Sequence, residues 1–190
     1  ANVAVSLSNF GKNVSYVTKL PSNDIAKAAV MSLRSHGVDV SNITYGGERI
    51  GIYFVEKGAS QRPSKVIYDR KYSSIAMATQ EDFDWKKIFD GANWFHFTGI
   101  TPALGDNVAE ICKTACKAAK EMGLTVSCDL NYRGNLWTPQ KAGEVMSGLM
   151  QYVDLCIANE EDAEKVFGIK ADDTDVVGGK LSAKGYVKVA

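Results

Sequence analysis

The sequence predicts an α/β fold: a Rossmann-like parallel sheet with flanking helices and a small antiparallel β lid. Two patterns support this prediction. In the second half of the chain, apolar strand-like segments alternate with amphipathic helical segments, which is typical of a parallel sheet covered by helices. Residues 42–73 instead contain short alternating strands separated by turns, which is typical of an antiparallel sheet. We therefore expect an α/β core of residues 1–41 and 74–190, with the lid at residues 42–73 inserted in it.

The composition narrows the range of partners. The chain has 190 residues, of which 45% are hydrophobic, and this suits one sizeable core with a small appendage. Its 22 basic and 22 acidic residues balance and form no run of like charge, so we expect no nucleic-acid partner. No apolar run approaches the ~20 residues that a membrane-spanning helix needs, so we expect no membrane span.

The chain contains four cysteines without a CxxC pair. They are accompanied by no histidine pattern at the spacing of a zinc site, so the sequence predicts that all four pack in the core. A reducing cytoplasm keeps such residues as thiols, and we expect the protein to be cytoplasmic. The four residues are Cys112, Cys116, Cys128 and Cys156.

The first part of the core is predicted to contain two helices and one strand. Residues 2–10 have a helical pattern, and residues 14–20 are a strand-like segment. A second helix is predicted over residues 24–35, because either Ser22 or Asn23 can cap its N-terminus.

The lid is predicted from three short segments whose polar and apolar residues alternate. These segments are residues 42–45, 49–56 and 64–71, and they are separated by "GG" and by "KGASQRP". Glycine and proline clusters of this kind form the turns of an antiparallel sheet, so we expect all three strands to pair in that way.

The second part of the core alternates strand and helix. The helix predicted after "TGITPAL" has apolar residues at the i, i+3, i+4 spacing, and the next helix begins with Pro139 at its first position. A polar, loop-like segment follows Gly168, and residues 183–190 are predicted as either a helix or a strand. The predicted strands are residues 93–100, 124–130 and 153–158, and the predicted helices are residues 105–123, 139–152 and 159–168.

Polar side chains gather where the second of these strands ends, in "DLNYRGNLW". Parallel sheets bind ligands at the carboxyl ends of their strands. Taken singly, Arg133 could form a surface ion pair and Asp129 could cap the loop. Together with Asn131 and Tyr132 they indicate a ligand site, because a planar guanidinium suits a carboxylate or a phosphate. Trp137 is predicted to be a packing anchor.

The segment "NEED" follows the third strand and has two interpretations. Asn159 can cap the helix, and Glu160, Glu161 and Asp162 favour its positive N-terminal end. Alternatively, these carboxylates hold Mg²⁺ through water beside a nucleotide, since Mg²⁺ retains several waters in proteins.

The lid offers three further candidates: Tyr53, Tyr68 and Arg70. They can be cross-strand pairs without a function, or they can supply phenol hydrogen bonds and a positive charge to a ligand. His96 lies among apolar neighbours and is predicted to be a near-core histidine with satisfied hydrogen bonds. The chain contains neither a GxxxxGK[ST] nor a GxGxxG motif, so neither a P-loop nor an ordinary dinucleotide site is expected.

Together these segments resemble the PfkB, or ribokinase-like, carbohydrate kinases. The resemblance is carried by "GIYFVEKG", "VIYDRK", "FHFTGITPAL", "DLNYRGNLW" and "NEEDAEKVFG", and it extends over nearly all of residues 1–168. It is strongest toward the members that phosphorylate 2-keto-3-deoxygluconate. The resemblance implies transfer of the γ-phosphoryl group of ATP to a primary hydroxyl of a small sugar acid, with Mg²⁺. It also implies that the lid serves as the clasp of a homodimer.

The resemblance also implies roles for single residues. The substrate contacts would be Tyr53, Tyr68 and Arg70 from the lid, Ile100 at the wall of the site, and Asn131 and Arg133 after the second strand. Asn159, Glu160 and Asp162 would lie at the family's N-x-x-E motif for magnesium and phosphate. Asp162 stands where the family has Glu, so either Asp162 or Glu160 would act toward the metal.

The chain departs from the family at the catalytic motif. A GAGD-like sequence, whose Asp is the family's general base, does not occur in these 190 residues. We therefore expect an internal fragment of a longer kinase that is inactive on its own. Two alternatives remain open: a fructokinase or another sugar kinase of the family, and a non-catalytic sugar-binding module.

Overall fold

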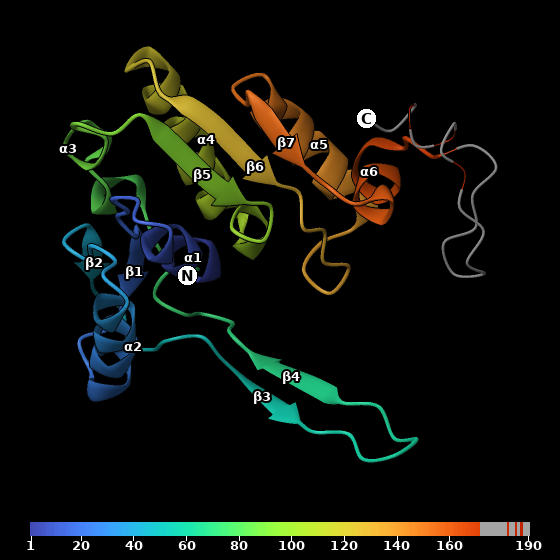
Figure 1. The fold of residues 1–190 in the computed structure, drawn as a ribbon, viewed down its shortest axis with the longest axis horizontal. Helices are drawn as coiled ribbons and strands as arrows, with labels where there is room; N and C mark the ends of the chain where they lie inside the picture. Colours follow the sequence, from blue (N-terminus) through green and yellow to red (C-terminus); the bar gives the residue numbers. More distant parts are fainter. Residues whose placement is uncertain (172–181, 183–184, 186, 188–190) are drawn as a thin grey trace. The chain divides into compact units, whose positions relative to one another are not determined.

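The computed structural model describes residues 1–171, 182, 185 and 187, and the chain forms two compact units (Figure 1). Unit 1 comprises Ala1–Asp84 and unit 2 comprises Trp85–Ala190. Most of the loop predicted after Gly168, and most of the helix or strand predicted at 183–190, fall outside the described residues. No helix among the described residues is both long enough and apolar enough to cross a membrane.

In unit 1, a first helix is followed by a small βαβ arrangement. The helix between the two strands starts where Asn23, rather than Ser22, accepts a hydrogen bond from the Ala26 N–H at 2.9 Å. Its buried face carries Val30 and Leu33, which pack with Ile43 in a small core. The elements are α1 (Asn2–Asn9), β1 (Thr18–Leu20), α2 (Asp24–Ser35) and β2 (Ile43–Tyr45).

The strand at Ile43–Tyr45 corrects one prediction. It was expected to pair in the antiparallel lid, but β2 pairs in parallel with β1, with Thr18 opposite Ile43 and Leu20 opposite Tyr45. The helix α2 returns the chain so that both strands run in the same direction, as in other crossover connections. The alternating pattern correctly predicts a strand here, but it does not specify which strand is its partner. The strand predicted over 14–20 is also shorter, and β1 covers only its last three residues.

The antiparallel lid consists of two strands, β3 (Ile52–Glu56) and β4 (Lys65–Asp69). Five residues of each strand pair, from Ile52 opposite Asp69 to Glu56 opposite Lys65. All ten of these residues are exposed. The lid is therefore a hairpin without a buried face. After the lid, the chain forms the short 3₁₀ turn η1 (Gln80–Asp82).

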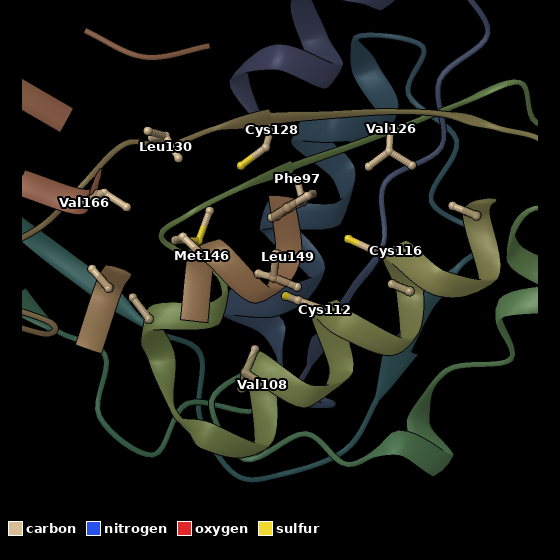
Figure 2. Packing of buried hydrophobic residues seen from close by; sticks show 14 of the residues in the cluster. Phe97, Val108, Cys112, Cys116, Val126, Cys128, Leu130, Met146, Leu149 and Val166 are labelled. Atoms are coloured by element: carbon tan, nitrogen blue, oxygen red, sulfur yellow. The ribbon is translucent and has the colours of Figure 1, made fainter. Parts of the chain in front are cut away.

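Unit 2 contains a three-stranded parallel sheet in the order β5-β6-β7. Two long helices, α4 and α5, cover one face of it (Figures 1 and 2). The opposite face carries Trp94, Leu155 and Ile157, which are about half exposed. The elements are α3 (Trp85–Ile88), β5 (Trp94–Thr98), the turn η2 (Pro102–Leu104), α4 (Asp106–Glu121), β6 (Thr125–Asp129), α5 (Pro139–Met150), β7 (Leu155–Ile157) and α6 (Glu160–Phe167).

The core of unit 2 lies between the sheet and these two helices. Figure 2 shows Phe97, Val126 and Cys128 pointing from the sheet toward side chains such as Val108 of α4 and Met146 of α5. Residues at alternate strand positions thereby meet the apolar stripe of each helix, as the sequence pattern predicts. The predicted start of α5 is confirmed, because Thr138 caps the helix and Pro139 is its first residue, whereas the helix ends at Met150, two residues before the predicted end.

The cysteines confirm three of four predictions. Cys112, Cys116 and Cys128 are buried in this core. Burial raises the pKa of Cys116 to about 12, so its thiol stays protonated and unreactive at neutral pH. The prediction for Cys156 is wrong, since this residue is exposed. It lies on β7, which is the edge strand of the described sheet and is exposed along all three residues.

Candidate functional site

The three parallel strands of unit 2 end side by side. Thr98 is paired with Asp129, and Asp129 is paired with Ile157, so the last residues of β5, β6 and β7 form one row across the sheet. The hydrogen-bond ladder continues beyond this row. The Gly99 N–H donates to the Asp129 carbonyl at 2.8 Å, and the Leu130 N–H donates to the Ile157 carbonyl at 2.9 Å. The loops that carry the predicted site residues therefore begin at fixed positions.

Gly99 permits the close approach of the first two loops. A Cβ atom at this position would lie 2.1 Å from the Leu130 carbonyl oxygen, so any other residue would push the two strand exits apart. The next residue, Ile100, is partly buried beside this contact. Ile100 thus lies at the carboxyl edge of the sheet, and its role at the wall of the site stays a prediction.

The loop after β6 presents Asn131 and Arg133. Asn131 has a φ of 41°, in the left-handed region that Asn tolerates better than most residues, and its amide donates to Asp129 Oδ2 at 3.3 Å. The exposed Arg133 donates from Nη1 to the Tyr132 carbonyl at 2.8 Å. Among the described residues no carboxylate forms an ion pair with Arg133, so the alternative of a surface ion pair is not supported.

Tyr132 fixes this loop through both its backbone and its side chain. Its backbone N–H donates to Asp162 Oδ1 at 2.9 Å, and its phenol donates to the Trp137 carbonyl at 3.2 Å. Trp137 is itself buried in the core of unit 2, which confirms its prediction as a packing anchor. The loop that carries Arg133 is therefore held by a buried indole and by a carboxylate of α6.

The start of α6 confirms the capping interpretation of "NEED". Asn159 Oδ1 accepts a hydrogen bond from the Asp162 N–H at 2.7 Å. Asp162 is 6% exposed, and its carboxylate accepts the Tyr132 N–H, so it links the second and third strand exits. Glu160 is partly buried and Glu161 is exposed. Among the described residues no group of three or more His, Cys, Asp or Glu side chains has the arrangement of a metal site.

The three lid candidates lie together in unit 1. Tyr53 and Tyr68 are directly opposite each other, with ring centroids 6.2 Å apart. The guanidinium carbon of Arg70 lies 4.4 Å from the centroid of the Tyr68 ring, which is a cation–π contact. The two rings do form the cross-strand pair that the first interpretation predicts. They also present two exposed phenols beside a positive charge, which suits an anion that carries hydroxyl groups.

His96 is satisfied near the core, as predicted. Its Nδ1 lies 2.8 Å from Ser127 Oγ, which also accepts a hydrogen bond from Trp94 Nε1 at 2.7 Å. Burial lowers the pKa of His96, although the charge of Asp129 opposes this effect, so the imidazole is neutral at pH 7. These contacts account for the residue without a ligand.

A polar cluster at the base of the lid was not predicted from the sequence. Asp82 forms a capping box with Thr79 and an ion pair with Lys19. A Thr-x-x-Asp pattern before a helical turn is a recognisable signal, and "TQED" contains it. The ion pair gives no such signal, because its partners are 63 residues apart.

Comparisons with a family model, with curated proteins and with solved structures all find carbohydrate kinases. A family model described as pfkB family carbohydrate kinase matches residues 1–189. The chain is similar to the crystal structure of 2-dehydro-3-deoxygluconokinase from Thermotoga maritima, with 54% identity and a TM-score of 0.92 over 99% of this chain and 56% of that one. A PfkB family carbohydrate kinase from Listeria grayi has 34% identity and a TM-score of 0.86 over 99% of this chain and 57% of that one.

The chain is also similar in sequence to a protein from Haloferax volcanii. It is named 2-dehydro-3-deoxygalactonokinase and is 34% identical over 172 residues, which are 90% of this chain and 54% of that protein. The chain thus spans about half the length of the relatives that it matches.

Asp162 allows a test of how the site is held together. In Asp162→Ala the partly buried Tyr132 N–H loses its acceptor, and we expect the free energy of unfolding to fall by about 1–3 kcal/mol. Asp162→Asn keeps an oxygen in place and should lose less. Urea unfolding followed by tryptophan fluorescence measures both, with the exposed Glu161→Ala as the control. If Asn is as harmful as Ala, the negative charge rather than the hydrogen bond stabilises this loop.

Proposed function

Since the chain belongs to the pfkB family of carbohydrate kinases, we propose that the full-length protein uses ATP to phosphorylate 2-keto-3-deoxygluconate to its 6-phosphate. The names of two relatives support this class of substrate. Gluconate and galactonate differ only in the configuration of one hydroxyl group, and both relatives act on the 2-dehydro-3-deoxy form. The shared chemistry is a small sugar acid with a carboxylate, a ketone and a terminal hydroxyl.

The observation that carries the proposal is the Arg70–Tyr68–Tyr53 cluster of the lid. Phenols donate hydrogen bonds to hydroxyl and ketone oxygens, and a guanidinium attracts a carboxylate. Arg133 adds a second positive charge at the carboxyl edge of the sheet, held by its loop but without an ion-pair partner among the described residues. A guanidinium at either position favours an acid over a neutral hexose, and this argues against the fructokinase alternative.

We place the nucleotide phosphates and Mg²⁺ near the start of α6. Asn159 holds the first turn of this helix, and Glu160 and Asp162 are acidic residues of that turn. The carboxylate of Asp162 already accepts the Tyr132 N–H, which fits contact with the metal through water better than direct ligation. Bound Mg²⁺ would neutralise charge on the β- and γ-phosphates. The residues of this chain would orient its water shell.

Phosphoryl transfer needs positioning, charge stabilisation and a base directed at the attacking hydroxyl. In this chain Arg133 would stabilise either the substrate carboxylate or the migrating phosphoryl group, while Asn131 and Ile100 would bound the sugar. The base itself is assigned to a GAGD-like motif, which these 190 residues do not contain. A non-catalytic sugar-binding module is the alternative that this absence keeps open.

We further propose that the protein acts in the cytoplasm and forms a homodimer. ATP is available in the cytoplasm, where the four free thiols would persist as thiols. The lid face opposite the tyrosines carries Ile52, Phe54 and Ile67, which are 37–57% exposed. A second copy of the lid could cover these side chains, so we propose a homodimer through this face. Neither nucleic acid nor a membrane enters the proposal.

The choice of substrate is tested with the full-length protein. We expect kcat/KM for 2-keto-3-deoxygluconate to exceed the values for fructose and ribose by at least about 10-fold, because only the acid pairs with the arginines. A coupled assay of ADP release measures all three sugars. A value for fructose that equals or exceeds that for the acid would favour the fructokinase alternative, and the absence of turnover on every sugar would favour the binding module.

Arg133 is tested by a substitution that keeps its charge. Arg133→Lys loses the planar fork of two parallel donors, so we expect kcat/KM for the sugar acid to fall ~10-fold or more, about 1.4 kcal/mol of transition-state stabilisation. Arg34→Lys, on the exposed surface of α2, is the matched control and should keep wild-type kinetics. Wild-type kinetics in a folded Arg133→Lys protein would leave Arg133 with only a structural role.

The role of the missing motif is tested with residues 1–190 alone. These residues contain part of the sugar side of the site but no GAGD-like motif, so we expect no sugar-dependent ADP release with ATP and Mg²⁺. Heat-treated protein and reactions without sugar are the controls. Clear turnover would show that the catalytic base lies within these residues and that its assignment to the missing motif is wrong.

A further inference from the structure

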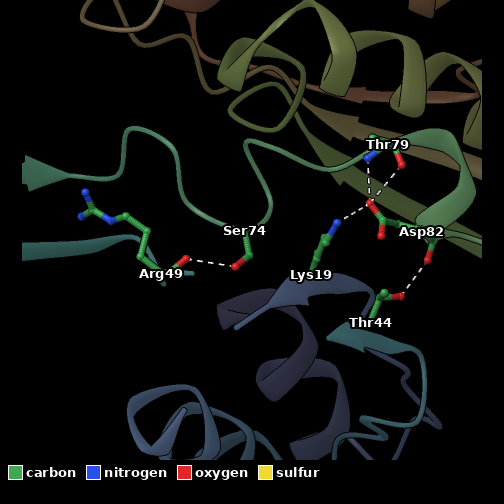
Figure 3. A network of polar contacts seen from close by, with 6 residues as sticks. All are labelled: Lys19, Thr44, Arg49, Ser74, Thr79 and Asp82. Carbon is green, nitrogen blue, oxygen red and sulfur yellow. Dashed lines mark hydrogen bonds and ion pairs between the residues drawn. The ribbon is translucent and has the colours of Figure 1, made fainter. Parts of the chain in front are cut away.

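The two chain segments that connect the lid to the rest of unit 1 are held by a polar cluster around Asp82 (Figure 3). Lys19 of β1 places its Nζ 2.6 Å from Asp82 Oδ2. Thr44 of β2 donates from Oγ1 to the Asp82 backbone carbonyl at 2.7 Å. Asp82 follows the lid in sequence, whereas Thr44 precedes it. One residue therefore joins the entry of the lid, its exit and the neighbouring strand.

One carboxylate oxygen of Asp82, Oδ2, accepts all the hydrogen bonds described for this side chain. Besides Lys19, Oδ2 accepts the Thr79 N–H at 2.7 Å and the Thr79 hydroxyl at 3.4 Å. The side chains of Lys19 and Asp82 are only 14% and 16% exposed, so their attraction is screened less than that of a surface pair. Burial raises the pKa of Asp82, but the hydrogen bonds from Lys19 and Thr79 outweigh it and hold this pKa below its usual value. Asp82 is therefore ionised at neutral pH.

A second set of contacts lies closer to the hairpin. The Ser74 N–H and hydroxyl both donate to the Arg49 carbonyl, at 2.8 and 3.1 Å. Arg49 in turn pairs with Asp69, the last residue of β4, at 2.7 Å. A Cβ atom at Gly47 would lie 2.7 Å from Ser74 Oγ, so this glycine lets the two segments approach. Entry and exit of the lid are thus joined twice before the β-ladder starts at Ile52.

The lid depends on these contacts because it has no buried face. All ten residues of β3 and β4 are exposed, and an isolated two-stranded hairpin is at best marginally stable in water. Holding the ends of the two connecting segments together lowers the entropy cost of closing the hairpin. Side-chain packing within unit 1 cannot set the direction of the lid, so the connecting segments must set it.

We propose, resting on the function above, that the Lys19–Asp82 pair is a positioning device that sets how the lid presents Tyr53, Tyr68 and Arg70 to the sugar acid. Neither residue of the pair is among the residues assigned to the substrate. The pair acts through the two lid connections, so its loss should weaken sugar binding while leaving the nucleotide side unchanged. If the pair served only the stability of unit 1, its loss would not weaken sugar binding while leaving the nucleotide side unchanged.

The test uses three variants of the full-length protein: Asp82→Asn, Lys19→Met and the double variant. Asn keeps an oxygen for the Thr79 N–H but removes the charge. The exposed pair Asp24 and Lys27 on α2, 70–95% exposed, provides the matched control through Asp24→Asn and Lys27→Met. Thr44→Val, which removes only the hydrogen bond to the Asp82 carbonyl, serves if a charge variant fails to fold.

Two measurements are made on each variant. In hydrogen exchange, we expect the lid amides at residues 52–69 to exchange at least about 10-fold faster, with β1 and β2 unchanged. In kinetics, we expect KM for the sugar acid to rise about 10-fold, with KM for ATP within about 2-fold of wild type. The double variant should be no worse than the worse single variant, because both remove one interaction. The control pair should change neither measurement.

The outcomes separate this proposal from the proposed function. Unchanged lid exchange in folded Asp82→Asn and Lys19→Met proteins would overturn the positioning role, whatever the kinetics. Faster exchange spread evenly over unit 1, or equal changes in both KM values, would overturn it in favour of a purely structural pair. If wild type phosphorylates no sugar acid, the proposed function fails, while lid-specific exchange would still support the positioning of the lid.

Discussion

The parallel register of β5, β6 and β7 is the constraint on which the candidate site in unit 2 depends. Because Thr98, Asp129 and Ile157 share one row, three loops that are distant in sequence start from neighbouring strands, each one strand spacing from the next. The helices α4 and α5 make this register obligatory, since a shift by one residue would turn Val126 and Cys128 away from their core. Burial on one face of the sheet thus determines which polar groups meet at its edge.

Two local features convert this row into a fixed site. Gly99 removes the one Cβ atom that would separate the first two exits, and the Asp162 carboxylate joins the second exit to the third through the Tyr132 N–H. Both features use the backbone of the loop after β6 and leave the Arg133 side chain exposed. The same residue, Asp162, also takes part in the cap of α6 through its own N–H. A residue that looks like a metal ligand in the sequence therefore has a structural role that is independent of any metal.

The sequence predicted what depends on local pattern and failed where partners are distant. Strands at Trp94–Thr98 and Thr125–Asp129, and the cap of α6 by Asn159, follow from periodicity and short-range hydrogen bonding. The parallel partner of β2 could not be predicted, because alternation is the same in parallel and antiparallel edges. The exposure of Cys156 depends on its place in an edge strand, and the Lys19–Asp82 pair depends on the return of the chain after the lid. Periodicity encodes neither of these.

The two groups of candidate ligand residues differ in how firmly they are held. The residues after β5, β6 and β7 are fixed by main-chain hydrogen bonds and by a buried carboxylate, so little ordering is left for a ligand to induce. Tyr53, Tyr68 and Arg70 instead lie on a hairpin without a core, held by its ladder and its two connecting segments. Elements of this kind belong to the low end of local stability. In the proposed function, the free energy of sugar binding therefore depends on how well the lid is ordered in advance, because conformational freedom that the connecting segments leave is lost when the ligand binds.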